Sequence, residues 1–250
     1  MVRINIPSGG ALRAECLRRW QAGEGFALAT LNLDHLVKLS RDAEFARAYA
    51  GQDLVVADGR PVVALARLAG RPVDLLPGSD LVVPLARLAT EAGQRVALVG
   101  ATAPVLETAA ETLRARVPGL DLGFCHAPEF GFDPDGAAAE AILRRLDAEG
   151  IGLCFLALGA PKQERLARRG RALAPRCGFA SVGAGLDFLG GGQRRAPRWM
   201  RRIGLEWLWR MGTDPLRLAP RYAACAAILP GLAIQAWRLR RDAPKPPGTG

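Results

Sequence analysis

The run Leu54-Val55-Val56-Ala57-Asp58-Gly59 decides the fold of this 250-residue chain. Its four apolar residues show no polar alternation, which is typical of a strand covered by helices on both faces, as in a parallel sheet. Asp58 then stands at the carboxyl end of that strand, the edge at which open α/β sheets bind ligands, and Gly59 permits a sharp turn. The alternative is that Asp58 caps a helix that begins at Pro61.

Further apolar runs alternate with segments of helical periodicity on both sides of this stretch. The predicted strands are 26–31, 54–57, 95–99, 120–125, 153–158 and 179–182. The predicted helices are 36–49, 61–70, 81–91 after a capping turn at 77–80, 104–116, 136–147 and one after Pro161. Repeated β-α-β units with short links predict an α/β fold built on a doubly wound, mostly parallel sheet.

Basic residues are concentrated toward the C-terminus. The net charge is +10, from 34 Lys and Arg against 24 Asp and Glu. Residues 194–250 hold 12 of the basic and 3 of the acidic residues, which leaves 22 and 21, a net of +1, for residues 1–193. The strand–helix alternation also stops there. We therefore expect a core, 1–193, a basic, Trp-rich helical appendage, 194–242, and a Pro-rich, disordered tail, 243–250.

The appendage contains one long apolar segment, Ala223–Trp237. It is shorter than the ~20 residues needed to cross a bilayer, and Pro230-Gly231 is predicted to break it. The arginines and aromatic residues that flank it suit a helix seated at the level of the lipid headgroups. The segment therefore predicts peripheral contact with a membrane, with packing on the core or on a second subunit as the alternative.

Polar groups follow several of the predicted strands, and in a parallel sheet such loops share one edge. The loops are Thr30-Leu31-Asn32, Asp58-Gly59, Gly159–Glu164 and Gly183–Phe188. The last loop is not a G-x-G-x-x-G, neither is Gly100-Ala101-Thr102-Ala103, and the sequence has no P-loop. The sequence therefore predicts a polar crevice and supports a nicotinamide site only weakly.

The sequence offers few residues in patterns that bind metal ions, and we predict neither a metal nor a cofactor. The cysteines contain no C-x-x-C, and we do not expect His35 and His126 to form a ligand pair. Asp133-Pro134-Asp135 matches the D-x-D by which many sugar-nucleotide enzymes hold a divalent ion, but it precedes a predicted helix, so we interpret it as a cap. No secretory signal follows Met1, so the cytoplasm is the expected compartment.

Spaced motifs run along nearly the whole chain in a fixed order. They are Thr30-x-Asn32, Ala57-Asp58-Gly59, Gly78-Ser79-Asp80-Leu81, Gly159-Ala160-Pro161-Lys162-Gln163-Glu164, Gly185-Leu186-Asp187-Phe188, Arg195-Ala196-Pro197-x-Trp199, Gly204-Leu205-Glu206-Trp207-Leu208-Trp209-Arg210 and Asp214-Pro215-x-Arg217-Leu218-x-x-Arg221-Tyr222. Because it carries these motifs in this order, the chain resembles the WecG/TagA/CpsF glycosyltransferases of bacterial surface polysaccharide synthesis. The resemblance implies a Rossmann-like core, an appendage that touches the membrane, and an inverting, metal-independent transfer from a UDP-sugar to a saccharide on undecaprenyl diphosphate.

The resemblance also implies roles for individual residues. Asp58 looks like the general base, Thr30 and Asn32 line the sugar site, and Gln163 helps to hold donor or acceptor. The full set of predicted substrate-binding residues is Thr30, Asn32, Gly59, Gln163, Gly185, Arg195, Arg210, Arg217 and Arg221, of which the last three are the first candidates to close over the diphosphate. The implied partners are the UDP-sugar, the lipid-diphosphate acceptor and the inner face of the cytoplasmic membrane, without nucleic acid, and a homo-oligomer is left open.

One loop departs from the family pattern. Many members that transfer N-acetylmannosamine have Pro or Ala and then Glu after the Asn, whereas this chain has Leu33-Asp34-His35. Because the loop faces the sugar in the implied arrangement, the donor stays open between N-acetylmannosamine, glucose and another hexose.

Two other classes of function are alternatives. One is a membrane- or nucleic-acid-binding module that uses the Arg- and Trp-rich segment, with a passive α/β scaffold. The near-neutral core and its clustered polar loops argue against it. The other is an NAD-dependent oxidoreductase, which the missing glycine fingerprint disfavours.

Overall fold

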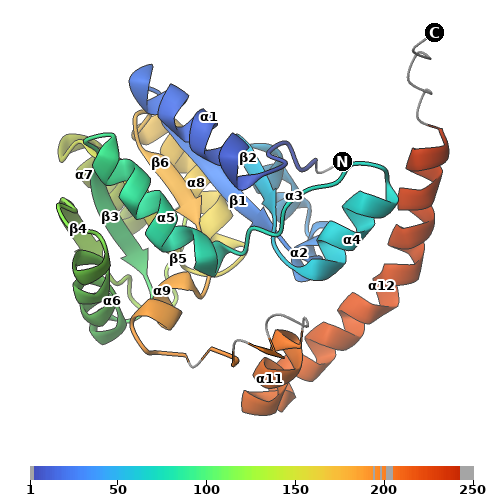
Figure 1. Cartoon of the computed structure of the whole chain (residues 1–250). Coiled ribbons are helices and arrows are strands. Elements are labelled where there is room, and N and C mark those ends of the chain that lie inside the picture. Colours follow the sequence, from blue (N-terminus) through green and yellow to red (C-terminus); the bar gives the residue numbers. More distant parts are fainter. Residues whose placement is uncertain (1–2, 194, 198, 201–204, 243–250) are drawn as a thin grey trace, which may run out of the picture.

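A computed structural model describes residues 3–193, 195–197, 199–200 and 205–242 (Figure 1). Six strands form one sheet in the order β2-β1-β6-β5-β3-β4, and every neighbouring pair is parallel. The strands are β1 (Phe26–Leu31), β2 (Leu54–Ala57), β3 (Arg95–Gly100), β4 (Leu122–His126), β5 (Ile151–Ala157) and β6 (Gly178–Ser181). The predicted Rossmann-like parallel sheet is confirmed, while the predicted tail, 243–250, lies outside the described residues.

Helices cover both faces of the sheet. They are α1 (Gly9–Gln21), α2 (Leu33–Leu39), α3 (Ala43–Ala50), α4 (Arg60–Leu68), α5 (Gly78–Glu91), α6 (Ala103–Arg116), α7 (Ala137–Ala148), α8 (Lys162–Leu173), α9 (Gly185–Leu189), α11 (Glu206–Thr213) and α12 (Pro215–Arg241). Leu28 and Val56 belong to the core formed with α1, α5 and α6, whereas their neighbours Ala29 and Val55 pack with α3. Successive strand residues therefore enter different cores, which explains the apolar runs without polar alternation.

Helix α1 was not predicted from the sequence. Its buried residues, Leu12, Cys16 and Trp20, recur every fourth position, and half of the remaining residues are polar. Ser8 caps it by accepting a hydrogen bond from the backbone N–H of Ala11. The apolar stripe is too narrow to stand out in the sequence, and the helix depends on the sheet that it covers.

The long C-terminal helix α12 is continuous, so the predicted break at Pro230-Gly231 is wrong. Pro220 and Pro230 both lie inside this helix. A proline has no N–H, so the carbonyl groups four residues earlier, those of Leu216 and Ala226, lose their helical hydrogen bond. All four residues are exposed, so these carbonyl groups can bind water instead. In the described part of the chain no helix is long and apolar enough to cross a membrane.

The appendage returns to the core at one edge of the sheet. Helix α12 packs on α2, α4 and α11 (Figure 1). Its residues Leu218 and Cys225 are buried. The carboxyl ends of the strands open on the side where α9, α11 and α12 lie. The predicted polar loops therefore meet at an edge that the appendage borders.

Candidate active site

Asp58 stands where β2 ends, beside the end of β1. Its backbone N–H donates to the carbonyl oxygen of Leu31 over 2.7 Å, which extends the β1–β2 pairing beyond the strand. The next residue, Gly59, has a φ of +103° and is itself the N-cap of α4, without a side-chain hydrogen bond. Gly59, not Asp58, is therefore the N-cap residue of α4, and Asp58 follows β2 at the carboxyl edge of the sheet, where open α/β folds bind ligands.

Thr30 and Asn32 lie at the end of β1. The Oδ1 atom of Asn32 accepts the backbone N–H of His35 over 3.0 Å, so Asn32 is the N-cap of α2. A Cβ on Gly59 would lie 4.0 Å from the Cβ of Asn32. Thr30 is buried, and its Oγ1 donates to the carbonyl oxygen of Ser181 over 3.4 Å, across β1 and β6. The structure thus brings Thr30, Asn32 and Gly59 together, and it gives Asn32 a capping role that the sequence did not reveal.

Gln163 and Glu164 open α8, directly after the β5 loop. Nε2 of Gln163 donates to Oε1 of Glu164 over 2.8 Å, and Oε1 of Gln163 accepts the backbone N–H of Gly183 over 3.2 Å. Glu164 is 0% exposed. Burial raises the pKa of its carboxyl group to about 7, against the opposing effects of the Gln163 hydrogen bond and the Lys38 charge. Gln163 therefore ties two loops of the edge together, and it does so beside Glu164, a buried carboxyl group to which the sequence analysis assigned no role of its own.

A buried histidine and two aromatic rings lie next to these groups. His35, Phe45 and Tyr49 contact one another edge to face, with ring centroids 5.4 to 5.8 Å apart. Burial lowers the pKa of His35 to about 4 and raises the pKa of the Tyr49 hydroxyl well above its usual value. The charges of Glu164 and Asp58 also raise the pKa of Tyr49, whose hydroxyl lies 3.5 Å from Nδ1 of His35. His35 is thus a neutral residue of the core.

The first turn of α5 lies against the loop between β6 and α9. The helix begins at Gly78, so the predicted capping turn at 77–80 is wrong. A Cβ on Gly78 would lie 3.0 Å from the carbonyl oxygen of Val182, and one on Gly185 would lie 3.0 Å from Cγ2 of Val82. Side chains at these two glycines would push α5 away from the sheet edge. Gly185 therefore shapes this wall by its lack of a side chain.

Arg195 joins the appendage to the core at this turn. Its Nη2 atom donates to Oγ of Ser79 over 2.7 Å and to Oδ1 of Asp80 over 2.5 Å. Its guanidinium carbon lies 5.3 Å from the centre of the Phe188 ring. Ser79 and Asp80, which the sequence placed in a capping turn, bind this arginine instead.

Arg221 also contacts the core. Its Nε lies 3.0 Å from Oδ1 of Asp34, and Nζ of Lys38 lies 3.0 Å from Oδ2 of the same carboxylate. The Arg221 contact is ionic, without the alignment of a hydrogen bond. The backbones of Arg210 and Arg217 lie in α11 and α12, but their side chains lie outside the described part of the chain. The diphosphate role of the three arginines stays a prediction, and Arg221 here pairs with α2.

Asp133 and Asp135 do not cap α7, so that prediction is wrong. The N-cap of α7 is Gly136, without a side-chain hydrogen bond. Oδ1 of Asp133 accepts the backbone N–H of Asp135 over 3.0 Å, and Asp135 pairs with Arg165 of α8. Among the residues that the structure describes, no group of three or more His, Cys, Asp or Glu side chains could hold a metal ion.

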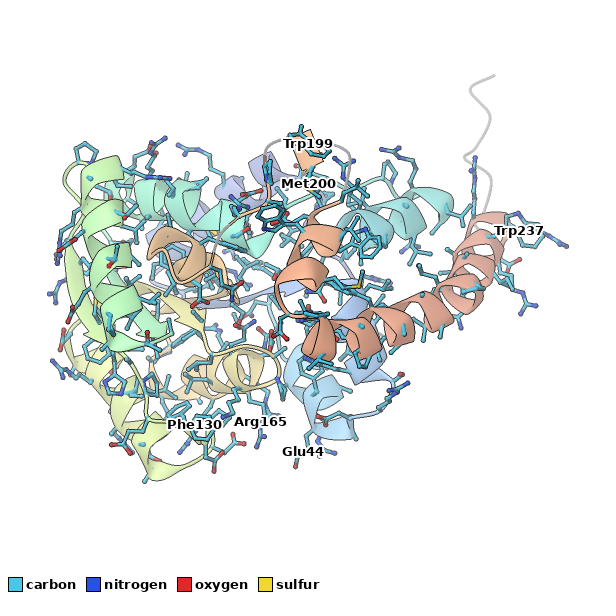
Figure 2. The ribbon with its side chains drawn as sticks, turned by 90° about the horizontal axis from the view of Figure 1, so that it is seen from below. Glu44, Phe130, Arg165, Trp199, Met200 and Trp237 are labelled. Carbon is cyan, nitrogen blue, oxygen red and sulfur yellow. The ribbon has the colours of Figure 1, made fainter. Side chains whose placement is uncertain are left out.

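Figure 2 shows the molecule from the side of this edge. Trp199 and Met200 lie on one border, Glu44, Phe130 and Arg165 lie on the opposite border, and Trp237 lies far along α12. The aromatic side chains among these residues are all exposed. Aromatic groups of the appendage and of the β4–α7 loop thus frame the carboxyl edge.

Comparison with known proteins agrees with this geometry. The model of the family described as "Glycosyl transferase WecG/TagA/CpsF family" matches residues 2–243. The chain is 26% identical over 197 residues to an N-acetylglucosaminyldiphosphoundecaprenol N-acetyl-beta-D-mannosaminyltransferase of Bacillus spizizenii, covering 78% of this chain and 74% of the relative. It is 26% identical over 206 residues to the protein of the same name from Bacillus subtilis, covering 80% and 78%. With its family motifs placed along one edge of a parallel sheet, the chain belongs to the WecG/TagA/CpsF family of glycosyl transferases.

Proposed function

We propose that this chain is an inverting glycosyltransferase that moves a hexose or N-acetylhexosamine from a UDP-sugar to a saccharide on undecaprenyl diphosphate. The observation that carries the proposal is the position of Asp58, which the main chain ties to the end of β1 at the ligand edge. A carboxylate held there can take the proton of an acceptor hydroxyl while its oxygen attacks the anomeric carbon from the face opposite UDP. A single displacement of this kind inverts the anomeric centre.

The structure bears on the choice of donor sugar. Asp34, which stands where the family pattern has Glu, pairs with Arg221 of α12, and the next residue, His35, lies in the aromatic core, so both side chains are turned toward the protein. This placement favours the donor group in the names of the relatives, N-acetylmannosamine, as the first to test. Glucose and other hexoses come second.

The leaving diphosphate needs positive charge, and the appendage supplies arginines at the same edge. Arg195 is already fixed at the start of α5, and Arg210 and Arg217 follow in α11 and α12. A guanidinium pairs with phosphate through two parallel hydrogen bonds, which suits a transfer without a divalent ion.

Exposed apolar residues near the end of α12 support peripheral binding to the inner face of the cytoplasmic membrane. Ile234, Trp237 and Leu239 are exposed near the end of the helix. The last turn also carries Arg238, Arg240 and Arg241, and each arginine near an anionic leaflet contributes about 1 kcal/mol. The acceptor lipid is fixed in the bilayer, so this surface would bring the sheet edge to its substrate.

Transfer to a lipid-diphosphate acceptor tests the proposal. We expect Asp58→Asn to lower turnover by roughly 10² to 10⁴ while UDP binding changes little, because the amide cannot accept the proton. Asp121→Asn is the control, since Asp121 is an exposed carboxylate at the amino end of β4. Turnover above about half of the wild-type value in Asp58→Asn would refute the assignment of the base.

A binding assay separates the alternatives. UDP at about 100 times its Kd adds about 2.7 kcal/mol to stability and raises Tm, whereas NAD and an oligonucleotide should give no shift. A shift with NAD or the oligonucleotide and none with UDP contradicts the proposed function.

A further inference from the structure

Glu164 is a buried carboxyl group that the reaction proposed above does not use. It is 0% exposed and lies directly after Gln163 at the start of α8. Its backbone carbonyl accepts a hydrogen bond from Nε2 of Gln52 over 3.0 Å, so the backbone is held as firmly as the side chain. A residue fixed in this way beneath a ligand edge can act on the site only through the groups that it holds.

The orientation of the Gln163 amide follows from its partners. A backbone N–H can only donate, so Gly183 requires the oxygen of the Gln163 amide. The nitrogen then faces Glu164, which must offer an acceptor, and its Oε1 does so over 2.8 Å. The chain Glu164–Gln163–Gly183 thus links the start of α8 to the turn that precedes α9, two segments at the carboxyl edge of the sheet.

The second carboxyl oxygen decides the charge of Glu164. Oε2 is buried and has no hydrogen-bond partner among the described residues, and a buried carboxylate oxygen without a partner is much costlier than a neutral O–H. The titratable groups that act on Glu164 or on which it acts are Lys38 of α2, whose ammonium also pairs with Asp34, and Tyr49 of α3. Because Lys38 already pairs with Asp34, the surroundings do not compensate a negative charge on Glu164.

We propose that Glu164 is a positioning residue that works as a neutral acid, holding Gln163 and the Gly183 turn in place at the carboxyl edge of the sheet. The inference rests on the proposed function, because transfer is the activity that this arrangement would serve. Loss of the Glu164 proton would leave a buried negative charge without compensation at the start of α8, where Gln163 holds the Gly183 turn. Transfer should therefore fail as Glu164 ionises near neutral pH.

The pH dependence of kcat/KM tests the inference. The pKa of about 7 predicts that the wild-type value falls about tenfold from pH 6 to pH 8. Glu164→Gln, a neutral side chain that still accepts from Gln163, should remove this fall. Glu164→Met, neutral but without an acceptor, should also be independent of pH, yet about tenfold slower than Glu164→Gln, because the Gln163 amide loses its partner.

The control is Glu44→Gln, since Glu44 is an exposed carboxylate of α3 that pairs with Arg165. It should keep the wild-type fall. A wild-type fall in Glu164→Gln overturns the neutral-acid role, and equal rates in Glu164→Gln and Glu164→Met overturn the positioning role.

A measurement without substrate separates this inference from the proposed function. The folded pKa of Glu164 lies above its unfolded value of 4.5, so the folded state holds the extra proton and loses stability as pH rises from 4.5 to about 7. The Tm of the wild type should therefore fall over this interval relative to Glu164→Gln. Parallel Tm curves overturn the inference, whereas a wild-type fall in Tm without transfer from any UDP-sugar refutes only the proposed function.

Discussion

Two leucines of α12 allow a direct test of how the appendage is attached to the core. Leu218 is 2% exposed, whereas Leu216, in the same helix, is 91% exposed. Truncation of a buried leucine to alanine costs about 2 to 5 kcal/mol, and a surface truncation stays within about 0.5 kcal/mol. The two variants, Leu218→Ala and Leu216→Ala, therefore remove the same groups from the same helix and differ mainly in how deeply the leucine is buried.

The loss should appear as local undocking. Helix α12 packs on α2 and α4 and takes no part in the sheet, so the core can remain folded when it leaves. A cost of about 3 kcal/mol raises the opening equilibrium constant of α12 about 100-fold, because each 1.4 kcal/mol is a factor of about ten. Hydrogen exchange should show this loss of protection in α12 peptides of Leu218→Ala, with β1 and β5 unchanged.

Leu216→Ala should exchange like the wild type. Equal protection of α12 in the two variants would show that Leu218 does not anchor the helix. Equal loss of protection in α12 and in the sheet would show that the appendage and the core unfold as one unit. Transfer to a lipid acceptor should fall in Leu218→Ala alone, since docking places the appendage arginines at the sheet edge.

Two further predictions concern protons and metal ions. The folded pKa of His35 is about 4, below its usual 6.5, so the unfolded chain binds the extra proton and the protein loses stability as pH falls from 6.5 toward 4. Denaturant titrations at both ends of this range should show a loss on the order of 3 kcal/mol that His35→Phe lacks, and equal losses would contradict the buried neutral histidine. Transfer should survive EDTA, because arginine meets the leaving-group charge. Activity that is lost on chelation and restored by Mg²⁺ or Mn²⁺ would contradict this prediction and make Asp133 and Asp135 candidate ligands of the ion.

Local sequence patterns were sufficient to predict the parallel sheet and the sheet edge at which the candidate site lies. An apolar run such as Leu54–Ala57 is recognisable because both faces of a parallel strand are buried, and all four residues are. The glycine after Asp58 marked the turn because its φ of +103° is strained for other residues. Spaced motifs then identified the family. Each of these signals lies within a few consecutive residues, so no knowledge of the tertiary contacts was needed.

Helix ends and continuity were less predictable. Helix α5 begins at Gly78 because close packing against Val182 fixes its first turn, which no capping pattern shows. Helix α12 passes through Pro230, and the carbonyl that the proline leaves without its helical partner belongs to the exposed residue Ala226, so it can bind water. In both cases the surroundings of the helix decided what its own sequence left ambiguous.

Only the tertiary structure decided which polar groups meet. The sequence offered Arg195 as a substrate-binding residue and Arg221 as a candidate for the diphosphate, and the fold pairs them with Asp80 and Asp34, residues more than a hundred positions away. In the sequence Glu164 was only the last residue of a motif, whereas the fold buries it completely and places it near Tyr49. The charge of a carboxyl group depends on solvent and on neighbours distant in sequence, and these arise only when the sheet, α8 and α12 have come together.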